Sequence, residues 1–206
     1  MLGFYNYTVV LTYIGMLFSF VGLNYIWKGD IKTAVLCLMI SGFCDMFDGK
    51  VASTKKDRTV NEKRFGIQID SLSDLICFGA LPALLLSTVP EKAPLHINMI
   101  AGGFYLLCAL IRLAYFNVDE EERQSKTKES RTVYLGLPVT TIALVLPLLF
   151  FISSHFQISL AVMGSVALFV VGLGFLTPFQ LKKPGTAGKL LMVAAGIAEF
   201  ILVIME

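Results

Sequence analysis

Residues 45–52 read Asp45-Met-Phe-Asp48-Gly49-Lys-Val-Ala52, and residues 66–74 read Gly66-Ile-Gln-Ile-Asp70-Ser-Leu-Ser-Asp74. Each stretch lies at the end of a strongly apolar segment, residues 31–47 for the first and residues 72–89 for the second. Carboxylates at the margin of a bilayer are costly to place there and by default mark function. The two stretches are therefore the first candidates for a functional site.

Helical spacing predicts which of these side chains share a face. A spacing of three places Asp45 and Asp48 on one face of a helix, and a spacing of four aligns Asp70 with Asp74 on the next. If the two helices are antiparallel neighbours, the four carboxylates converge. Like charges this close repel one another, so the carboxylates can all stay ionised only when cations are bound between them. Ligands that are all oxygen favour Mg²⁺ or Mn²⁺ over Zn²⁺. The predicted metal ligands are Asp45, Asp48, Asp70 and Asp74.

The composition predicts a membrane protein. The chain has 206 residues, a length typical of one domain, and 56% of them are hydrophobic while 16% are charged. Several apolar runs reach the roughly 20 residues that a helix needs to cross a bilayer. We expect an all-α, polytopic bundle without a nucleic-acid-binding surface, since the net charge is only +2. The expected spans are Thr8–Trp27, Ile31–Ala52, Gly66–Val89, His96–Phe116, Val133–Ser153, Ile158–Leu176 and Ala187–Met205.

The basic residues predict the orientation of these spans. With Lys50 and Lys189 at the adjoining span ends included, six Lys and Arg residues flank the connector between the second and third spans, four lie between the fourth and fifth, and three flank the connector between the sixth and seventh. The connectors on the opposite side hold only Lys28, Lys32 and Lys92. The positive-inside rule therefore places the acidic stretches on the cytoplasmic side. The polar stretch Asp119–Thr132 is expected to be a solvated loop or a helix end.

The two acidic stretches together resemble the signature of the CDP-alcohol phosphotransferase family, D-x-x-D-G-x-x-A-R…G-x-x-x-D-x-x-x-D. The six-helix core of that family would cover residues 8–176, and a helix at residues 187–205 would be an addition within one integral membrane domain. The resemblance implies an enzyme that moves a phosphatidyl or similar group from a CDP-linked donor onto an alcohol and releases CMP. It implies a homodimer in the cell membrane, a metal site at the four Asp residues, and Asp74 as general base. Small side chains at Gly49, Ala52 and Gly66 would let the nucleotide approach the helix backbones.

The chain departs from the signature in two places. The family's Arg after Ala is Ser53 here, and the spacing from that position to Gly66 is four residues longer than the usual eight. A polar connector tolerates such an insertion cheaply. Lys50, Lys55 or Lys56 are the candidates to supply the missing charge.

Two further segments resemble the phosphatidylserine synthases of this family. Residues 70–82 are similar to D-S-x-x-D-x-x-x-F-G-x-x-P, and residues 112–118, followed by Gly136-Leu-Pro138, are similar to R-L-A-R-F-N-V…G-L-P. This likeness implies CDP-diacylglycerol as the donor and L-serine as the acceptor. Arg112 is the one basic residue inside a span away from its ends. It and Asn117 are candidates to hold the acceptor or its phosphate.

Other interpretations of the same residues stay open at this point. Arg112 could extend to the interface, Asn117 could cap a helix end, and Asp74 could be a metal ligand only. Each small residue alone is typical of helix packing. A close alternative function uses glycerol 3-phosphate or inositol phosphate as the acceptor. A remote alternative is a cation transporter. Such a protein would favour acidic residues near the middle of the membrane and discontinuous helices at corresponding positions in two similar halves of the chain.

Overall fold

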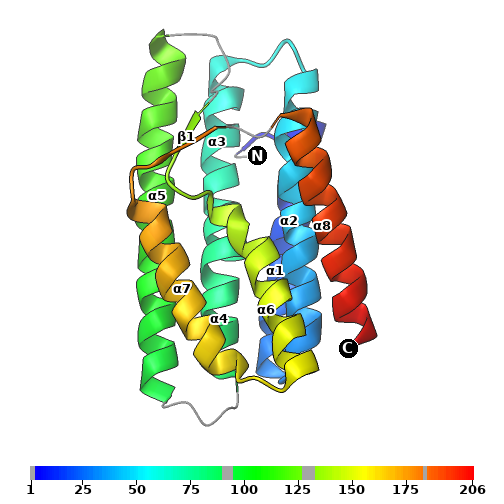
Figure 1. Ribbon diagram of the computed structural model, residues 1–206. Coiled ribbons are helices and arrows are strands. Elements are labelled where there is room, and N and C mark those ends of the chain that lie inside the picture. The colour runs from blue at the N-terminus through cyan, green and yellow to red at the C-terminus, as the bar shows by residue number, and fades with distance from the viewer. Residues whose placement is uncertain (1–2, 90–94, 127–132, 183–184) are drawn as a thin grey trace.

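The computed structural model describes residues 3–89, 95–126, 133–182 and 185–206, and it is a bundle of upright helices (Figure 1). The helices are α1 (Val10–Trp27), α2 (Ile31–Thr54), α3 (Val60–Asp74), α4 (Leu81–Thr88), α5 (Leu95–Lys126), α6 (Ile142–Phe156), α7 (Leu160–Leu176) and α8 (Thr186–Met205). A π-helical segment, Leu75–Ala80, joins α3 to α4, and single 3₁₀ turns at Tyr7–Val9 and Val139–Thr141 precede α1 and α6. The predicted all-α bundle is confirmed.

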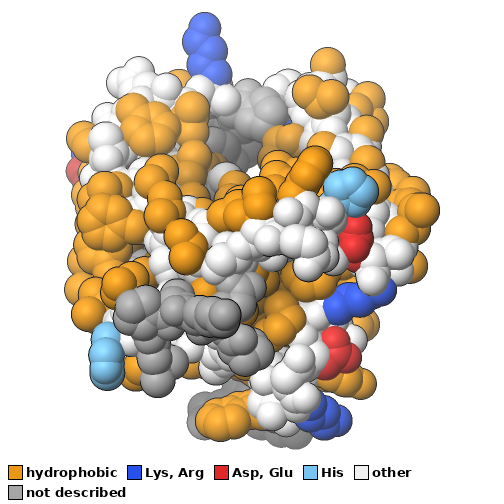
Figure 2. Space-filling view, turned by 60° about the horizontal axis from the view of Figure 1, so that its bottom comes forward, with side chains coloured by type: hydrophobic (Ala, Val, Ile, Leu, Met, Phe, Trp, Pro, Cys, Tyr) orange, Lys and Arg blue, Asp and Glu red, His pale blue; other side chains and the backbone are white. Residues whose placement is uncertain are grey.

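The chain is a multi-pass membrane protein. Within the described residues, five of the seven expected spans are long and apolar enough to cross a membrane. These five are Tyr7–Trp27, Val60–Thr88, His96–Arg123, Val139–Phe156 and Thr186–Met205. Helix α7 is a shorter apolar helix, and α2 is not among the candidate spans. Large apolar side chains on their outer faces are exposed, as expected where lipid replaces water. Figure 2 shows hydrophobic side chains over much of the visible face of the bundle, with few charged side chains among them.

Helix caps fix the ends of the two helices that carry the acidic motif. Asp30 caps α2, since its two carboxylate oxygens accept from the Thr33 N–H at 2.9 Å and from the Thr33 hydroxyl at 2.7 Å. These hydrogen bonds lower the pKa of Asp30. Thr59 and Glu62 form a capping box at the start of α3. The short connector between α2 and α3 therefore turns the chain back on itself, and the two helices run antiparallel (Figure 1).

Helix α1 packs against both α2 and α3 and holds them in register. Small residues allow this close approach: a Cβ atom added to Gly22 would meet the Cys37 side chain at 3.0 Å and Leu81 at 3.2 Å. The Ser19 and Ser41 hydroxyl groups hydrogen-bond across the same interface at 2.9 Å. The acidic helices are thus supported from one side by a helix that carries no part of the motif.

The π-helical segment begins directly after Asp74. A π-turn displaces the regular hydrogen-bond ladder and is frequent at functional sites. Here the fully buried Tyr105 on α5 donates its hydroxyl hydrogen to the Phe78 carbonyl at 2.6 Å. This hydrogen bond fixes α5 against the segment that follows the acidic motif.

Three expected boundaries were wrong. The third span begins at Val60 rather than Gly66. The fourth span continues past Phe116 to Lys126, because Glu120 pairs with Arg123 at 2.5 Å and Glu122 pairs with Lys126, each within one helical turn. The polar stretch from Asp119 is therefore a helix end as far as Lys126, and residues 127–132 lie outside the described part of the chain.

The fifth span begins at Val139 rather than Val133. Strand β1 (Val133–Leu135) pairs antiparallel with β2 (Gln180–Lys182), with Val133 opposite Lys182. Gly136 ends the strand with a φ of 70° and donates its N–H to the Phe179 carbonyl at 2.8 Å. A side chain there would meet backbone oxygens at 3.0 Å, so the turn requires glycine.

Candidate functional site

Three of the four predicted metal ligands come together in the structure. Asp45 on α2 and Asp70 and Asp74 on α3 each present a carboxylate oxygen, and these oxygens lie within 4.8 Å of one another. None of the three forms an ion pair with a Lys, Arg or His side chain in the described part of the chain. A cluster of hard oxygen ligands without a basic counterpart fits a divalent cation of the Mg²⁺ or Mn²⁺ type.

Asp48 stands beside this cluster and is held from α1. Its side chain is only 8% exposed, and one carboxylate oxygen accepts from the Thr12 hydroxyl group at 2.9 Å. Its carboxyl group is near enough to those of Asp45 and Asp70 to interact with them electrostatically. Thr12 was not predicted as a site residue, because a single Thr in an apolar helix carries no signal in the sequence.

A polar cavity of about 900 Å³ opens beside Asp48 and Asp70. The three small residues predicted to contact a nucleotide all line it: Gly49, Ala52 and Gly66. A Cβ atom added to Gly49 would meet nothing within 4 Å, so this part of the wall is open. Helix packing therefore does not explain the glycine at this position.

Basic side chains surround the same cavity, although they are not the expected ones. Lys50, Lys55 and Lys56, the candidates to replace the family's arginine, are not among the residues that line it. Lys55 instead pairs with Glu62 at 2.7 Å, a contact that raises the pKa of the Lys55 ammonium group. The basic residues that do line the cavity are Arg58, Lys63, Arg64 and Arg123.

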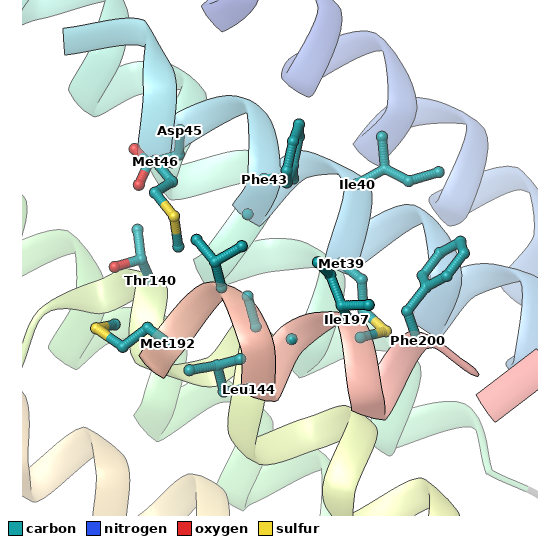
Figure 3. Close-up of a pocket in the computed structure, with 14 residues that line it drawn as sticks. Met39, Ile40, Phe43, Asp45, Met46, Thr140, Leu144, Met192, Ile197 and Phe200 are labelled. Atoms are coloured by element: carbon teal, nitrogen blue, oxygen red, sulfur yellow. The ribbon is translucent and has the colours of Figure 1, made fainter. Parts of the chain in front are cut away.

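A second cavity, of about 370 Å³, is apolar and reaches the same cluster from the side of α6 and α8 (Figure 3). Asp45 and Thr140 lie at one end of it, and Phe200 of α8 lies towards the other. The rest of its wall is almost wholly hydrocarbon, and much of it comes from Met and Ile side chains. Asp45 is thus exposed to an apolar space, whereas Asp70 is exposed to a polar one. The sequence did not predict this cavity, because its lining combines helices far apart in the chain.

The two candidate acceptor residues lie on α5. Arg112 is 7% exposed, and its Nε–H donates to the Leu137 carbonyl at 3.4 Å, which ties α5 to the turn before α6. Asn117 accepts from the Ser71 hydroxyl group at 2.6 Å and donates to the Gln68 side chain at 3.3 Å. Asn117 does not cap a helix end, since α5 continues for two further turns. It contacts the residue next to Asp70, whereas Arg112 lines neither of the two cavities described above.

Comparison with known proteins gives a family for this arrangement. A 90-residue segment is 34% identical to an archaetidylserine synthase of Methanothermobacter thermautotrophicus, covering 44% of this chain and 37% of that protein. A CDP-diacylglycerol–serine O-phosphatidyltransferase of Saccharomyces cerevisiae is 33% identical over 111 residues, 52% of this chain and 38% of the relative. The Bacillus subtilis protein of the same name is 26% identical over 146 residues, 71% of this chain and 76% of the relative.

The chain spans less than two fifths of the length of the first two of these relatives. The family description "CDP-alcohol phosphatidyltransferase" matches residues 5–176, which include α1 to α7 and both acidic stretches and leave out α8. The chain belongs to the CDP-alcohol phosphatidyltransferase family.

Proposed function

We propose that this protein transfers the phosphatidyl group of CDP-diacylglycerol to L-serine, giving phosphatidylserine and CMP. One observation carries the proposal: the carboxylate cluster lies between two cavities, with Asp70 lining the polar one and Asp45 lining the apolar one. The donor has the same two halves, a charged nucleotide and a pair of hydrocarbon chains, joined by the diphosphate at which the reaction occurs. The names of the yeast and Bacillus relatives support this donor and this acceptor.

Each half of the donor has a matching set of residues. The nucleotide would lie in the polar cavity, where Gly49, Ala52 and Gly66 leave the helix backbones accessible. An acyl chain would enter the apolar cavity between α2, α6 and α8, which is long and lined by hydrocarbon (Figure 3). The diphosphate would then lie next to the carboxylates.

Asp45, Asp70 and Asp74 would hold a divalent cation, with Asp48 completing the site from the α1 side. A bound Mg²⁺ or Mn²⁺ supplies positive charge against the diphosphate and the departing CMP. The Asp48–Thr12 hydrogen bond would keep the Asp48 carboxylate in a fixed orientation.

The reaction needs a group that accepts a proton from the alcohol. The serine hydroxyl oxygen forms a bond to the phosphorus of the phosphatidyl group, the bond from that phosphorus to the CMP oxygen breaks, and the hydroxyl proton passes to a base. We assign this base to Asp74, in keeping with the family resemblance. The adjoining π-helical segment, held by Tyr105, would fix the position of Asp74 relative to the phosphorus.

Serine is favoured by the relatives and by the residues 112–118, but one observation supports another acceptor. Lys63 and Arg64 line the polar cavity, and both would suit an acceptor that carries its own phosphate, such as glycerol 3-phosphate or inositol phosphate. The positive-inside rule supports a cytoplasmic opening of this cavity in the cell membrane, where soluble acceptors are present. A homodimer is the assembly that the family resemblance implies.

The test is a reaction with purified protein in lipid nanodiscs, CDP-diacylglycerol, Mg²⁺ or Mn²⁺ and a panel of labelled alcohols. We expect CMP release that depends on the metal and on L-serine, with phosphatidylserine as the labelled product. Faster turnover with glycerol 3-phosphate or inositol phosphate would replace the acceptor and keep the reaction class. Absence of CMP release with every acceptor, in a preparation that binds CDP, would contradict the proposed reaction.

A further inference from the structure

The connector between α2 and α3 contains an arginine, Arg58, whose guanidinium group lies beside Ala52, the residue that the family's arginine would follow. The arginine of the family signature would follow Ala52, where this chain has the exposed Ser53. Arg58 lies five residues further on, in the part of the chain where the connector is longer than usual. Its guanidinium group turns back over the helix, and Nη1 donates to the Ala52 carbonyl at 3.1 Å.

The same guanidinium group reaches the second half of the motif. A Cβ atom added to Gly66 would lie 2.9 Å from Nη2 of Arg58. Arg58 therefore bridges the wall of the polar cavity between Ala52 and Gly66, two of the three small residues that line it. Gly66 has a second role in this arrangement, because a larger side chain would displace the guanidinium group.

The Nε atom of Arg58 is buried and has no hydrogen-bond partner within the described residues. A buried donor without a partner is costly, and native structures rarely keep one without a use. Arg58 also has no ion pair with a carboxylate in the same part of the chain, unlike Lys55, which pairs with Glu62. Arg58 lines the same cavity as Asp48 and Asp70, and a guanidinium group there that is not paired with a carboxylate fits an anion bound in the cavity.

We propose that Arg58 binds the diphosphate of the CDP moiety and replaces the arginine that Ser53 lacks. The inference rests on the proposed function for the identity of the nucleotide. A planar guanidinium group can donate two parallel hydrogen bonds to phosphate oxygens, which a lysine cannot. The four additional connector residues would provide the length that brings Arg58 back to the position left vacant at Ser53.

The proposal is tested by binding of CDP to the purified protein with Mg²⁺ and without acceptor, measured by calorimetry. We expect Arg58→Gln to weaken CDP binding by about tenfold or more, the loss typical of a charge-assisted contact. Lys56→Gln is the matched control, because it removes the same charge from an exposed side chain of the same connector that does not line the cavity. This control should bind CDP like the unmodified protein.

A rescue variant separates a binding role from a folding role. Ser53→Arg in the Arg58→Gln background restores an arginine at the family's own position, and we expect it to recover most of the CDP affinity. Thermal unfolding in detergent checks that each variant is folded. Any of three results would overturn the proposal. The folded Arg58→Gln variant could bind CDP with unchanged affinity, Lys56→Gln could lose as much CDP affinity as Arg58→Gln, or the folded double variant could fail to recover CDP affinity. An unmodified protein that binds CDP through Arg58 but makes no phosphatidylserine would instead contradict the proposed reaction alone.

Discussion

Asp45 and Asp74 belong to one carboxylate cluster but face different surroundings. Asp45 also lines the apolar cavity, where the donor's hydrocarbon chain would pass, whereas Asp74 lies directly before the π-helical segment. The two aspartates are therefore expected to differ in role: Asp45 helps to hold the donor, and Asp74 takes part in the proton transfer.

We predict that Asp74→Asn lowers kcat by about a hundredfold or more and changes CDP-diacylglycerol affinity less than Asp45→Asn does. A general base acts in the chemical step, while a metal ligand also helps to hold the diphosphate. Steady-state kinetics combined with donor binding measures both effects. If Asp74→Asn weakens donor binding as much as Asp45→Asn and lowers kcat no further, Asp74 is a ligand only.

Arg112 gives a second prediction at this scale. Arg112→Lys keeps the charge but loses the planar fork and the Nε donor that contacts the Leu137 carbonyl. We expect a higher KM for serine or a lower kcat, with a melting temperature close to that of the unmodified protein. A normal KM and kcat would remove Arg112 from the acceptor site and leave the reaction class unaffected.

Helix α8 is the element that lies outside the family match and nevertheless forms part of a cavity. Gly196 faces Leu144 of α6, and a Cβ atom added to Gly196 would meet the Leu144 side chain at 3.6 Å, an ordinary contact. A small substitution is therefore tolerated there, while a larger side chain would occupy the apolar cavity.

We predict that Gly196→Leu lowers kcat/KM for long-chain CDP-diacylglycerol severalfold more than for a short-chain donor, because the added side chain fills the space for hydrocarbon. Ala195→Leu is the control, since the neighbouring residue is exposed on α8 and does not line the cavity. Competition between donors of two chain lengths measures the selectivity. Equal losses for both donors, or the same selectivity change in the control, would show that the cavity does not hold an acyl chain.

The elements that local patterns determine were predictable, and those set by tertiary contacts were not. Long apolar runs predicted five of the seven expected spans, and the four-residue spacing of Asp70 and Asp74 predicted that their carboxylates share a face and converge with Asp45. The π-helical segment was not predictable, because it depends on the Tyr105 hydroxyl group from another helix. The β1–β2 ribbon likewise joins residues 45 to 49 positions apart, and short strands in polar connectors have no periodic signal. The role of Arg58 in the cavity wall was not predicted, because the fold of the α2–α3 connector brings Arg58 to the cavity and no sequence spacing indicates this.

For the whole molecule, the orientation across the membrane follows from the distribution of basic residues. We predict that a cysteine at position 56, in the α2–α3 connector, reacts with a membrane-impermeant maleimide only after the cells are permeabilised. A cysteine at position 28, in the exposed turn after α1, should react in intact cells. The four natural cysteines are buried and give a low background. The reverse pattern for Lys56→Cys and Lys28→Cys would place the polar cavity on the outer side.

We infer that one carboxylate cluster holds a divalent cation between the polar and the apolar cavity. Anomalous diffraction from crystals soaked in Mn²⁺ tests this claim most directly, because the signal locates the metal independently of activity. We expect one or two peaks within coordination distance of Asp45, Asp70 and Asp74, at about 2.0–2.6 Å from carboxylate oxygens. Peaks confined to other parts of the protein, with these three carboxylates unligated, would contradict it.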